Sequence, residues 1–423
     1  MLRLYNTMSR EKELFIPRQG NKTVKMFSCG PSIYRRPHLG NYRSFVWEDL
    51  LQRYLEYSGY EVERVLNFTD VEDKALQEAQ DEGITLSELT SPVAERFFQD
   101  AKQLQIKLPE TIPRSSTSVD QAAALIRVLL DKGYAYWHRN NVFFDPLKFQ
   151  GFGKLARLDM TRWPQRKRRF KKDTYHGRRW NLGDFIIWHG CRAGDKVFWE
   201  TEIGRGRPSW NIQDPAMVTK HLGYAIDICC GGVDNLYRHH DYNIALIEAV
   251  SGGEFAHYWV HGDHLLVNGR KMSKSVGNIV YPDDLLTDVC TGRHVRFYLL
   301  YGHHRKRLNF TSSSFRKTIG ILDDLRTALR EIMPPAAATM PSGFLKNGNP
   351  RERSAWLQNS FEDCLNDDLN VRGAIEGRGR QLAKLVKLSR AGRLRGEERL
   401  AVAQEVQQID MVLQVLYPAA YPP

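Results

Sequence analysis

The unit that decides the fold begins with residues 24–34, which read Val-Lys-Met-Phe-Ser-Cys-Gly-Pro-Ser-Ile-Tyr. The start of this stretch is typical of a strand, and Gly30-Pro31 interrupts it. Residues 42–58 then place apolar side chains at helical spacing, and Gly59 follows as a stop signal. Residues 62–68 look like a second strand. A strand, a helix and a strand in this order predict a parallel sheet with a right-handed crossover.

Other patterns surround this unit. Residues 85–135 are predicted to be mostly helical, with a break near Pro109 to Pro113, whereas residues 141–200 are rich in aromatic and basic residues and look like an irregular insertion. Strand and helix signals return from Ile226 to Val260. From residue 311 onward the pattern is helical, with further predicted helices at 352–366, 371–390 and 396–416 and a loop from Pro334 to Pro350.

These patterns predict an α/β fold: a Rossmann-like parallel-sheet domain interrupted by an α/β insertion and followed by a C-terminal α-helical bundle. The expected boundaries are 1–120 and 201–265 for the two halves of the sheet domain, 121–200 for the insertion, 266–312 for a loop and connecting segment, and 313–423 for the bundle.

Bulk composition narrows the class of protein. The chain has 423 residues, too many for one ordinary core, and 42% of them are hydrophobic. It contains no apolar run of the roughly 18 residues that a membrane helix needs, and residues 1–6 lack the apolar core of a signal peptide, so we expect a cytoplasmic protein without a membrane partner. Six scattered cysteines without a CxxC pair argue against a disulfide framework or a zinc ribbon. The net charge of +12 favours polyanions, nucleic acid among them.

The first motif with chemical content is His38-Leu39-Gly40-Asn41, where the first strand has ended and the first helix begins. A helix N-terminus exposes unpaired N–H groups and partial positive charge, which suit a phosphate. Gly40 lets a nucleotide approach the backbone, and His38 can donate to a phosphate oxygen as negative charge develops on it. Taken alone, the motif also fits a histidine in a glycine-containing turn.

The second motif is Lys271-Met272-Ser273-Lys274-Ser275, with Gly269 before it and Gly277 after it. Glycine on both sides predicts a mobile loop. Two ammonium groups on such a loop can stabilise the charge of a reacting triphosphate more in the transition state than in the ground state. The alternative is a solvated basic loop.

Together the two motifs resemble the HIGH and KMSKS signatures of class I aminoacyl-tRNA synthetases. Further segments resemble the cysteinyl enzymes: Phe27–Tyr34 is similar to YVCGPTVY, Asn67–Lys74 to NITDVDDK, Gly206–Trp210 to the start of GRPGWHIECSAM, His264–Asn278 to HLLVNGEKMSKSLGN, and Asp367–Asn370 to DDDFN. The similarity runs from about residue 2 to residue 418. It implies an ATP- and Mg²⁺-dependent ligase that forms an aminoacyl-adenylate without a nucleophilic side chain, because the substrate carboxylate attacks the α-phosphate.

The resemblance also implies roles for individual residues. The implied catalytic residues are His38 and Asn41 at the phosphates, and Lys271 and Lys274 at the leaving pyrophosphate. The implied ATP-binding residues are His38, Gly40, Asn41, Gly231, Gly232, Asp234 and Lys274. The implied amino-acid pocket consists of Cys29, Ser32, Trp210, Asp214 and His239.

The chain departs from the family at the metal site. Members hold Zn²⁺ with two cysteines, a histidine and a glutamate, and the substrate thiolate binds that ion. Here Cys29 and His239 match, but Asp214 stands at the second cysteine and Asn243 at the glutamate. Cysteine, carboxylate and imidazole are all zinc ligands, so Cys29, Asp214 and His239 form one candidate metal site. Without metal, Asp214 lines a pocket for a cationic or hydroxylated amino acid, or caps a helix before Pro215.

A second departure is Cys229-Cys230, which stands where the family has histidine and glycine ahead of Gly231-Gly232. A side chain at Cys230 is expected where bare backbone approaches the nucleotide. Two interpretations stay open for this pair: replacement sulfur ligands, or buried packing.

Two basic groups bear on RNA. Arg162, Arg166, Lys167, Arg168, Arg169, Lys171, Lys172, Arg178 and Arg179 lie among aromatic residues in the insertion, and residues 303–307 read His-His-Arg-Lys-Arg. Interleaved basic and aromatic residues suit phosphate contact and base stacking, although a solvated charge run has the same composition. By resemblance the insertion faces a tRNA acceptor end. Many bacterial relatives continue into a further small domain that helps to read the anticodon, so anticodon recognition is an open expectation.

Three functions remain to be weighed. The first is transfer of an activated amino acid, cysteine by resemblance, to tRNA. The second is transfer to a small-molecule amine, and the third is an RNA-binding paralogue without catalysis. His38 and the complete lysine loop favour an enzyme, and the basic insertion favours tRNA. We expect a monomer with an amino acid, ATP and tRNA as its ligands.

Overall fold

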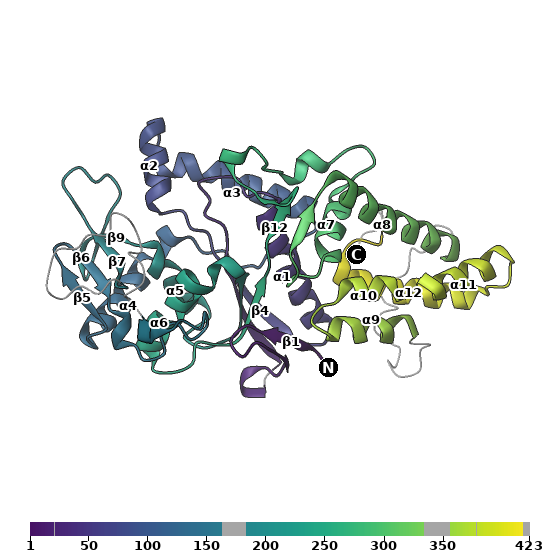
Figure 1. Cartoon of the computed structure of the whole chain (residues 1–423), viewed down its shortest axis with the longest axis horizontal. Helices are drawn as coiled ribbons and strands as arrows, with labels where there is room; N and C mark the ends of the chain where they lie inside the picture. The colour runs from purple at the N-terminus through teal and green to yellow at the C-terminus, as the bar shows by residue number, and fades with distance from the viewer. Residues whose placement is uncertain (21, 163–182, 334–355, 378, 418–423) are drawn as a thin grey trace.

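The computed structural model describes residues 1–423 except 21, 163–182, 334–355, 378 and 418–423. Three parts follow one another along the longest axis (Figure 1): an antiparallel sheet with α4, a central parallel sheet, and a group of helices that ends in α11 and α12. Among the described helices, none is long and apolar enough to cross a membrane.

The central sheet is parallel, as the sequence predicts. Its strands have the order β11-β10-β3-β4 and span Ala256–Gly262, Ile226–Gly232, Thr23–Ser28 and Glu61–Leu66. Helix α1, Leu39–Tyr57, connects β3 to β4, which confirms the predicted βαβ unit. The chain order of the strands reverses between β3 and β10. In open parallel sheets, ligands bind beyond the carboxyl ends of the strands at such a reversal.

The predicted α/β insertion is present, but residues 141–200 differ from the irregular segment expected there. Instead of an irregular segment the insertion contains a five-stranded antiparallel sheet of order β5-β6-β7-β9-β8. The strands are Ala135–His138, Asn141–Phe144, Phe185–Gly190, Trp199–Thr201 and Gly204–Pro208. Strands of three to six residues are too short for a clear alternating pattern, and a register shift between Val142 and Phe143 breaks the alternation further.

Helices α5 and α6, Trp210–His221 and Asp241–Ser251, pack against α4, Val119–Asp131, and share its apolar core. Helices α2 and α3 span Asp73–Glu82 and Leu86–Gln103. The remaining strands are β1 and β2, Arg3–Asn6 and Glu11–Leu14, and the small sheet β13-β12-β14 of Arg270–Lys271, Leu265–Val267 and Leu308–Phe310.

The C-terminal helices confirm the predicted bundle, with one split. They are α7 Gly292–Tyr301, α8 Ser312–Ile332, α9 Trp356–Asn366, α10 Val371–Glu376, α11 Gly379–Arg390 and α12 Gly396–Leu413. The expected helix over 371–390 is thus two helices. The expected loop from Pro334 to Pro350 lies outside the described residues.

The bundle and the sheet domain are joined by a buried arginine. Arg296 on α7 is fully buried, and its Nη2 donates to Asp49 Oδ2 on α1 at 2.5 Å. Its Nε donates to the carbonyl of Leu413 at the end of α12 at 2.7 Å. Because a buried charge is costly unless it is paired, this cation ties the two parts together as one body. One apolar core also runs through both parts.

Candidate active site

The candidate site lies at the carboxyl edge of the parallel sheet. Cys29 follows β3, Asn67 follows β4, and Gly231-Gly232 end β10. Parallel strands bring these positions to one edge, although they are far apart in the sequence.

His38 is the N-cap of α1, as its position after the first strand predicts. Its Nδ1 accepts from the backbone N–H of Asn41 at 3.3 Å, and the Asn41 side chain accepts from the His38 N–H at 3.0 Å. Burial lowers the pKa of His38. A neutral ring whose Nδ1 accepts carries its proton on Nε2, so Nε2 is the donor that remains for a ligand.

The lysine loop lies against this helix start. The N–H of Leu39 donates to the carbonyl of Val280 at 2.8 Å. A Cβ added to Gly40 would stand 2.8 Å from Cε of Met272, so the loop residue packs onto the glycine. The structure therefore brings together the two segments that the sequence separates by more than 200 residues.

Lys271 extends the contact to the glycine turn after β10, since its Nζ lies 3.5 Å from Asp234 Oδ2. Both groups are more than half exposed, so this ion pair is weak and free to rearrange around a ligand. A Cβ on Gly232 would stand 2.5 Å from Asp234 Oδ1, and one on Gly231 would stand 2.7 Å from Cε1 of His240. A side chain at Gly231 would collide with the buried ring of His240, so that position requires glycine, whereas at Gly232 the half-exposed Asp234 side chain can move aside.

An ion-pair network holds Asp283, which lies in the segment that follows the lysine loop and is called the loop foot below. Arg36 Nη2 lies 2.7 Å from Asp283 Oδ1 and 3.1 Å from Asp100 Oδ1. Arg96 also reaches Asp283, at 2.7 Å. The hydrogen bond from Arg36 holds the pKa of Asp283 below its usual value. Because Asp100 is fully buried on α3, the network attaches the loop foot to the sheet domain.

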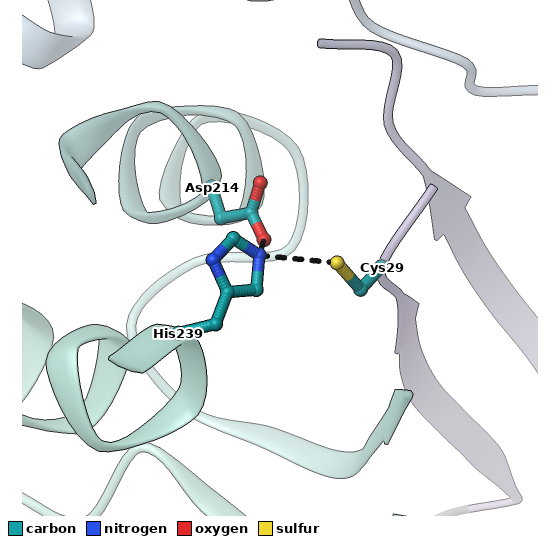
Figure 2. Close-up of side chains that lie close together, drawn as sticks. All are labelled: Cys29, Asp214 and His239. Carbon is teal, nitrogen blue, oxygen red and sulfur yellow. Dashed lines mark hydrogen bonds and ion pairs between the residues drawn. The ribbon is translucent and has the colours of Figure 1, made fainter. Parts of the chain in front are cut away.

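Cys29, Asp214 and His239 converge on one point (Figure 2). Sγ of Cys29 lies 3.1 Å from Nε2 of His239, and Oδ2 of Asp214 lies 2.6 Å from the same nitrogen. Oδ2 is buried and makes no hydrogen bond of good geometry with any described residue. A sulfur, a carboxylate oxygen and an imidazole nitrogen that face one another in this way fit the donor set of a zinc ion.

The same geometry argues against a nucleophilic cysteine. In a Cys–His–Asp relay the acid and the thiol contact opposite ring nitrogens, whereas here both lie at Nε2 of His239. Burial, followed by the Asp214 charge, raises the pKa of Cys29 well above its usual value. Burial lowers the pKa of His239, but the Asp214 carboxylate outweighs burial and leaves that pKa raised. A thiol without an activating base is no nucleophile at neutral pH.

Asn67 is a site residue to which the sequence analysis gave no role. It is fully buried, and its Nδ2 donates to Asp214 Oδ1 at 2.9 Å. The signal was present, because Asn67 follows β4 as Cys29 follows β3. Asn243, at the fourth family position, is buried on α6, and its Nδ2 has no hydrogen-bond partner among the described residues.

Trp210 and Ser32 also border the site. The Trp210 ring stacks on His239, with centroids 5.2 Å apart and planes 17° apart. Ser32 hydrogen bonds to Glu72, whose pKa burial raises. Glu72 is thus a second neighbour without an assigned role.

Three expectations need correction. Asp214 is no helix cap, because Ser209 caps α5 and Asp214 lies inside the helix. Cys229 and Cys230 are fully buried in two different apolar clusters, and neither belongs to a possible metal-ligand group among the described residues. Packing is therefore the interpretation that holds, and Cys230 does not face the nucleotide turn.

The two basic groups have different outcomes. Residues 166–179 lie outside the described residues, and of that group only Arg162 is described. In the segment 303–307, Arg305 pairs with the buried Asp368 and His304 is buried, so only part of this segment presents charge to solvent.

Comparison with known proteins gives consistent matches. Residues 15–319 match the family described as "tRNA synthetases class I (C) catalytic domain". The chain is 35% identical over 421 residues to a cysteine--tRNA ligase of Chlamydia pneumoniae, covering 98% of this chain and 86% of that protein. It is 35% identical over 387 residues to a cysteine--tRNA ligase of Bacillus cereus, covering 88% and 79%. A methionyl-tRNA synthetase of Mycobacterium tuberculosis in complex with methionyl-adenylate shares the fold, with a TM-score of 0.68 at 15% identity, covering 95% and 92%.

Proposed function

The chain belongs to the cysteinyl-tRNA synthetase family and is an aminoacyl-tRNA synthetase-type ligase, and from this premise we propose that it activates cysteine with ATP and transfers it to tRNA. The observation that carries the proposal is the contact of Met272 with Gly40, which sets the lysine loop over the N-terminus of α1. A triphosphate bound at this junction would have helix N–H groups on one side and the Lys271 ammonium group on the other.

In the first step the amino-acid carboxylate attacks the α-phosphorus of ATP and pyrophosphate leaves. Nε2–H of His38 and the amide of Asn41 are proposed to contact the phosphates, with Lys271 and Lys274 stabilising the leaving pyrophosphate. Gly40, Gly231, Gly232 and Asp234 are proposed to hold the nucleotide. Mg²⁺ is the expected partner of the triphosphate. In the second step a tRNA ribose hydroxyl attacks the aminoacyl carbonyl and AMP leaves.

Cys29, Asp214 and His239 are proposed to hold Zn²⁺ at the amino-acid end, and the convergence of their sulfur, oxygen and nitrogen atoms supports this. When bound, zinc takes a substrate thiolate far better than a hydroxyl, which selects cysteine over serine. Trp210 packs on His239 and is proposed to orient its ring, and Ser32 is proposed to line the same pocket.

The acceptor is proposed to be tRNA, since the relatives are named as tRNA ligases and no observation favours a small amine or a silent paralogue over them. A monomer and a cytoplasmic location stay predictions.

The test is amino-acid-dependent exchange of pyrophosphate into ATP across all amino acids, followed by aminoacylation of bulk tRNA. We expect cysteine to support exchange and to be attached to tRNA as an ester. If no amino acid supports exchange, the proposal fails. If exchange occurs and tRNA is not charged, the activation step stands and the acceptor is wrong.

A further inference from the structure

Asn67 connects two of the three converging residues. Its Nδ2 donates to Asp214 Oδ1, and its Oδ1 accepts from the N–H of Gly30, both at 2.9 Å. Gly30 is the residue after Cys29. One fully buried amide therefore joins the strand end that carries the sulfur to the helix that carries the carboxylate.

The orientation of this amide is fixed by chemistry. The N–H of Gly30 can only donate, and an ionised carboxylate can only accept. Asn67 must therefore turn its oxygen to Gly30 and its nitrogen to Asp214, as the structure has it. The backbones of Gly30 and Asn67 also lie very close together, because a Cβ on Gly30 would stand 1.7 Å from the backbone oxygen of Asn67. Only glycine fits at position 30.

The two carboxylate oxygens of Asp214 are thereby made different. Oδ1 accepts from Asn67, whereas Oδ2 is buried and pairs with Nε2 of His239 at 2.6 Å. We propose that Asn67 is a positioning residue that holds Asp214 so that only Oδ2 faces the cation site. This role exists because an aspartate stands here, since a cysteine thiolate offers a single donor atom and has no second oxygen to restrain. The inference rests on the metal part of the proposed function.

Asn67→Asp is the sharpest variant. It keeps an oxygen for Gly30 but replaces the donor toward Asp214 with a second carboxylate. Two carboxylates at this distance either repel, which turns Asp214 away from a metal, or share a proton, which lowers the negative charge that Asp214 offers the metal. Partners that orient metal ligands typically carry about 10- to 100-fold in affinity, so we expect zinc affinity to fall by about that factor. Asn67→Ala removes both contacts, and its zinc affinity should fall by a similar factor. It replaces Asn67→Asp in the experiment if the new carboxylate prevents folding.

The measurement is cobalt and zinc titration of the metal-free full chain, without substrate. Co²⁺ reports the Cys29 thiolate through its sulfur charge-transfer absorption, and zinc affinity follows from competition with a chelator. Asn211→Asp is the matched control. Asn211 is a buried asparagine on α5, the helix of Asp214, but its side-chain amide donates to the carbonyl of Ile186 instead. Thermal unfolding of each metal-free variant separates loss of affinity from loss of fold.

A double-mutant cycle decides the mechanism. In the Asp214→Cys background, Asn67→Asp should lower zinc affinity by less than threefold, because no second oxygen remains to be held. Equal losses in both backgrounds, or unchanged affinity of Asn67→Asp in the natural background, would overturn the positioning role while the proposed zinc site stands. Absence of stoichiometric zinc binding by the natural chain would overturn the metal site itself and this inference with it.

Discussion

The phosphate end and the amino-acid end of the site are built differently. At the phosphate end, side chains and backbone groups of a helix start meet a loop, and the ion pair of Lys271 with Asp234 is more than half exposed on both sides. At the amino-acid end, Cys29, Asp214 and His239 meet with Asn67 behind them, and Asp214 is fully buried. At the phosphate end, the motifs at His38 and Lys271 match the family signatures, and the changes at Cys229 and Cys230 are buried in the core. The amino-acid end has two of four family ligands changed.

The difference teaches where sequence change is tolerated. A triphosphate has one shape and one charge, so backbone donors and ammonium groups that suit it leave little choice. A buried ligand set can exchange members when a neighbour restrains the newcomer, as Asn67 restrains Asp214. Four experiments can break or sharpen this contrast, from the largest expected effect to the smallest.

The phosphate end should fail through the loss of a single donor. In His38→Asn, an asparagine keeps the helix cap but cannot place a donor where Nε2 stands. We expect the rate of pyrophosphate exchange to fall by about 10²–10³-fold, the range for loss of one transition-state donor, with the midpoint of thermal unfolding nearly unchanged. A variant that unfolds instead would show that His38 serves the fold rather than the phosphates.

The amino-acid end should fail selectively. Cys29→Ala removes the sulfur of the ligand group, and zinc affinity should fall by more than the roughly 100-fold upper range for partners outside the ligand set. The KM for cysteine should rise, while the KM for ATP should change little because the phosphate end is separate. Metal analysis and steady-state exchange check this. An equal rise in both KM values would mean that the two ends are not independent.

Low pH should destabilise the fold through His261, a buried histidine near the site. Burial lowers its pKa to about 3, and it lies 2.7 Å from His240 and 2.9 Å from Thr7. The unfolded chain takes up this proton near pH 6.5 and the folded chain only near pH 3, so stability is full above pH 6.5 and is lost as pH falls. At pH 5 the loss is about 2 kcal/mol. Urea unfolding should give a free energy of unfolding for the natural chain and for His261→Gln at each pH. The difference between the two should shrink by this amount from pH 7 to pH 5, and a difference that stays constant would contradict the prediction.

The loop foot should give the smallest effect. Asp283→Asn weakens its ion pairs with Arg36 and Arg96, and Asp283 is 38% exposed, so each pair contributes about 1 kcal/mol or less. We expect the KM for ATP to rise by up to about tenfold, with cysteine binding unaffected. Asp288→Asn, an exposed aspartate in the same segment, is the control. If both variants behave alike, the network does not position the loop.

Local sequence predicted elements well wherever the pattern was long. The helix after His38 and the helices of the bundle bury regular apolar faces, and α1 and α8 are 19 and 21 residues long. In the insertion the predicted α/β composition is confirmed, but the strands within 141–200 were missed, because strands such as Trp199–Thr201 are stabilised by their neighbours in the sheet rather than by their own pattern.

By itself, the sequence determined the βαβ unit and the motifs at His38 and Lys271, because helical periodicity, glycine turns and residue chemistry are local properties. The three converging residues were indicated by the resemblance to a known family. Only the tertiary structure decided that Cys229 and Cys230 pack inside the core, that Asp214 and Cys29 share one nitrogen of His239, and that Asn67 holds Asp214. These facts depend on the direction in which a side chain leaves its strand or helix after distant segments meet. Such directions are set by packing across the sheet edge, which no single segment encodes.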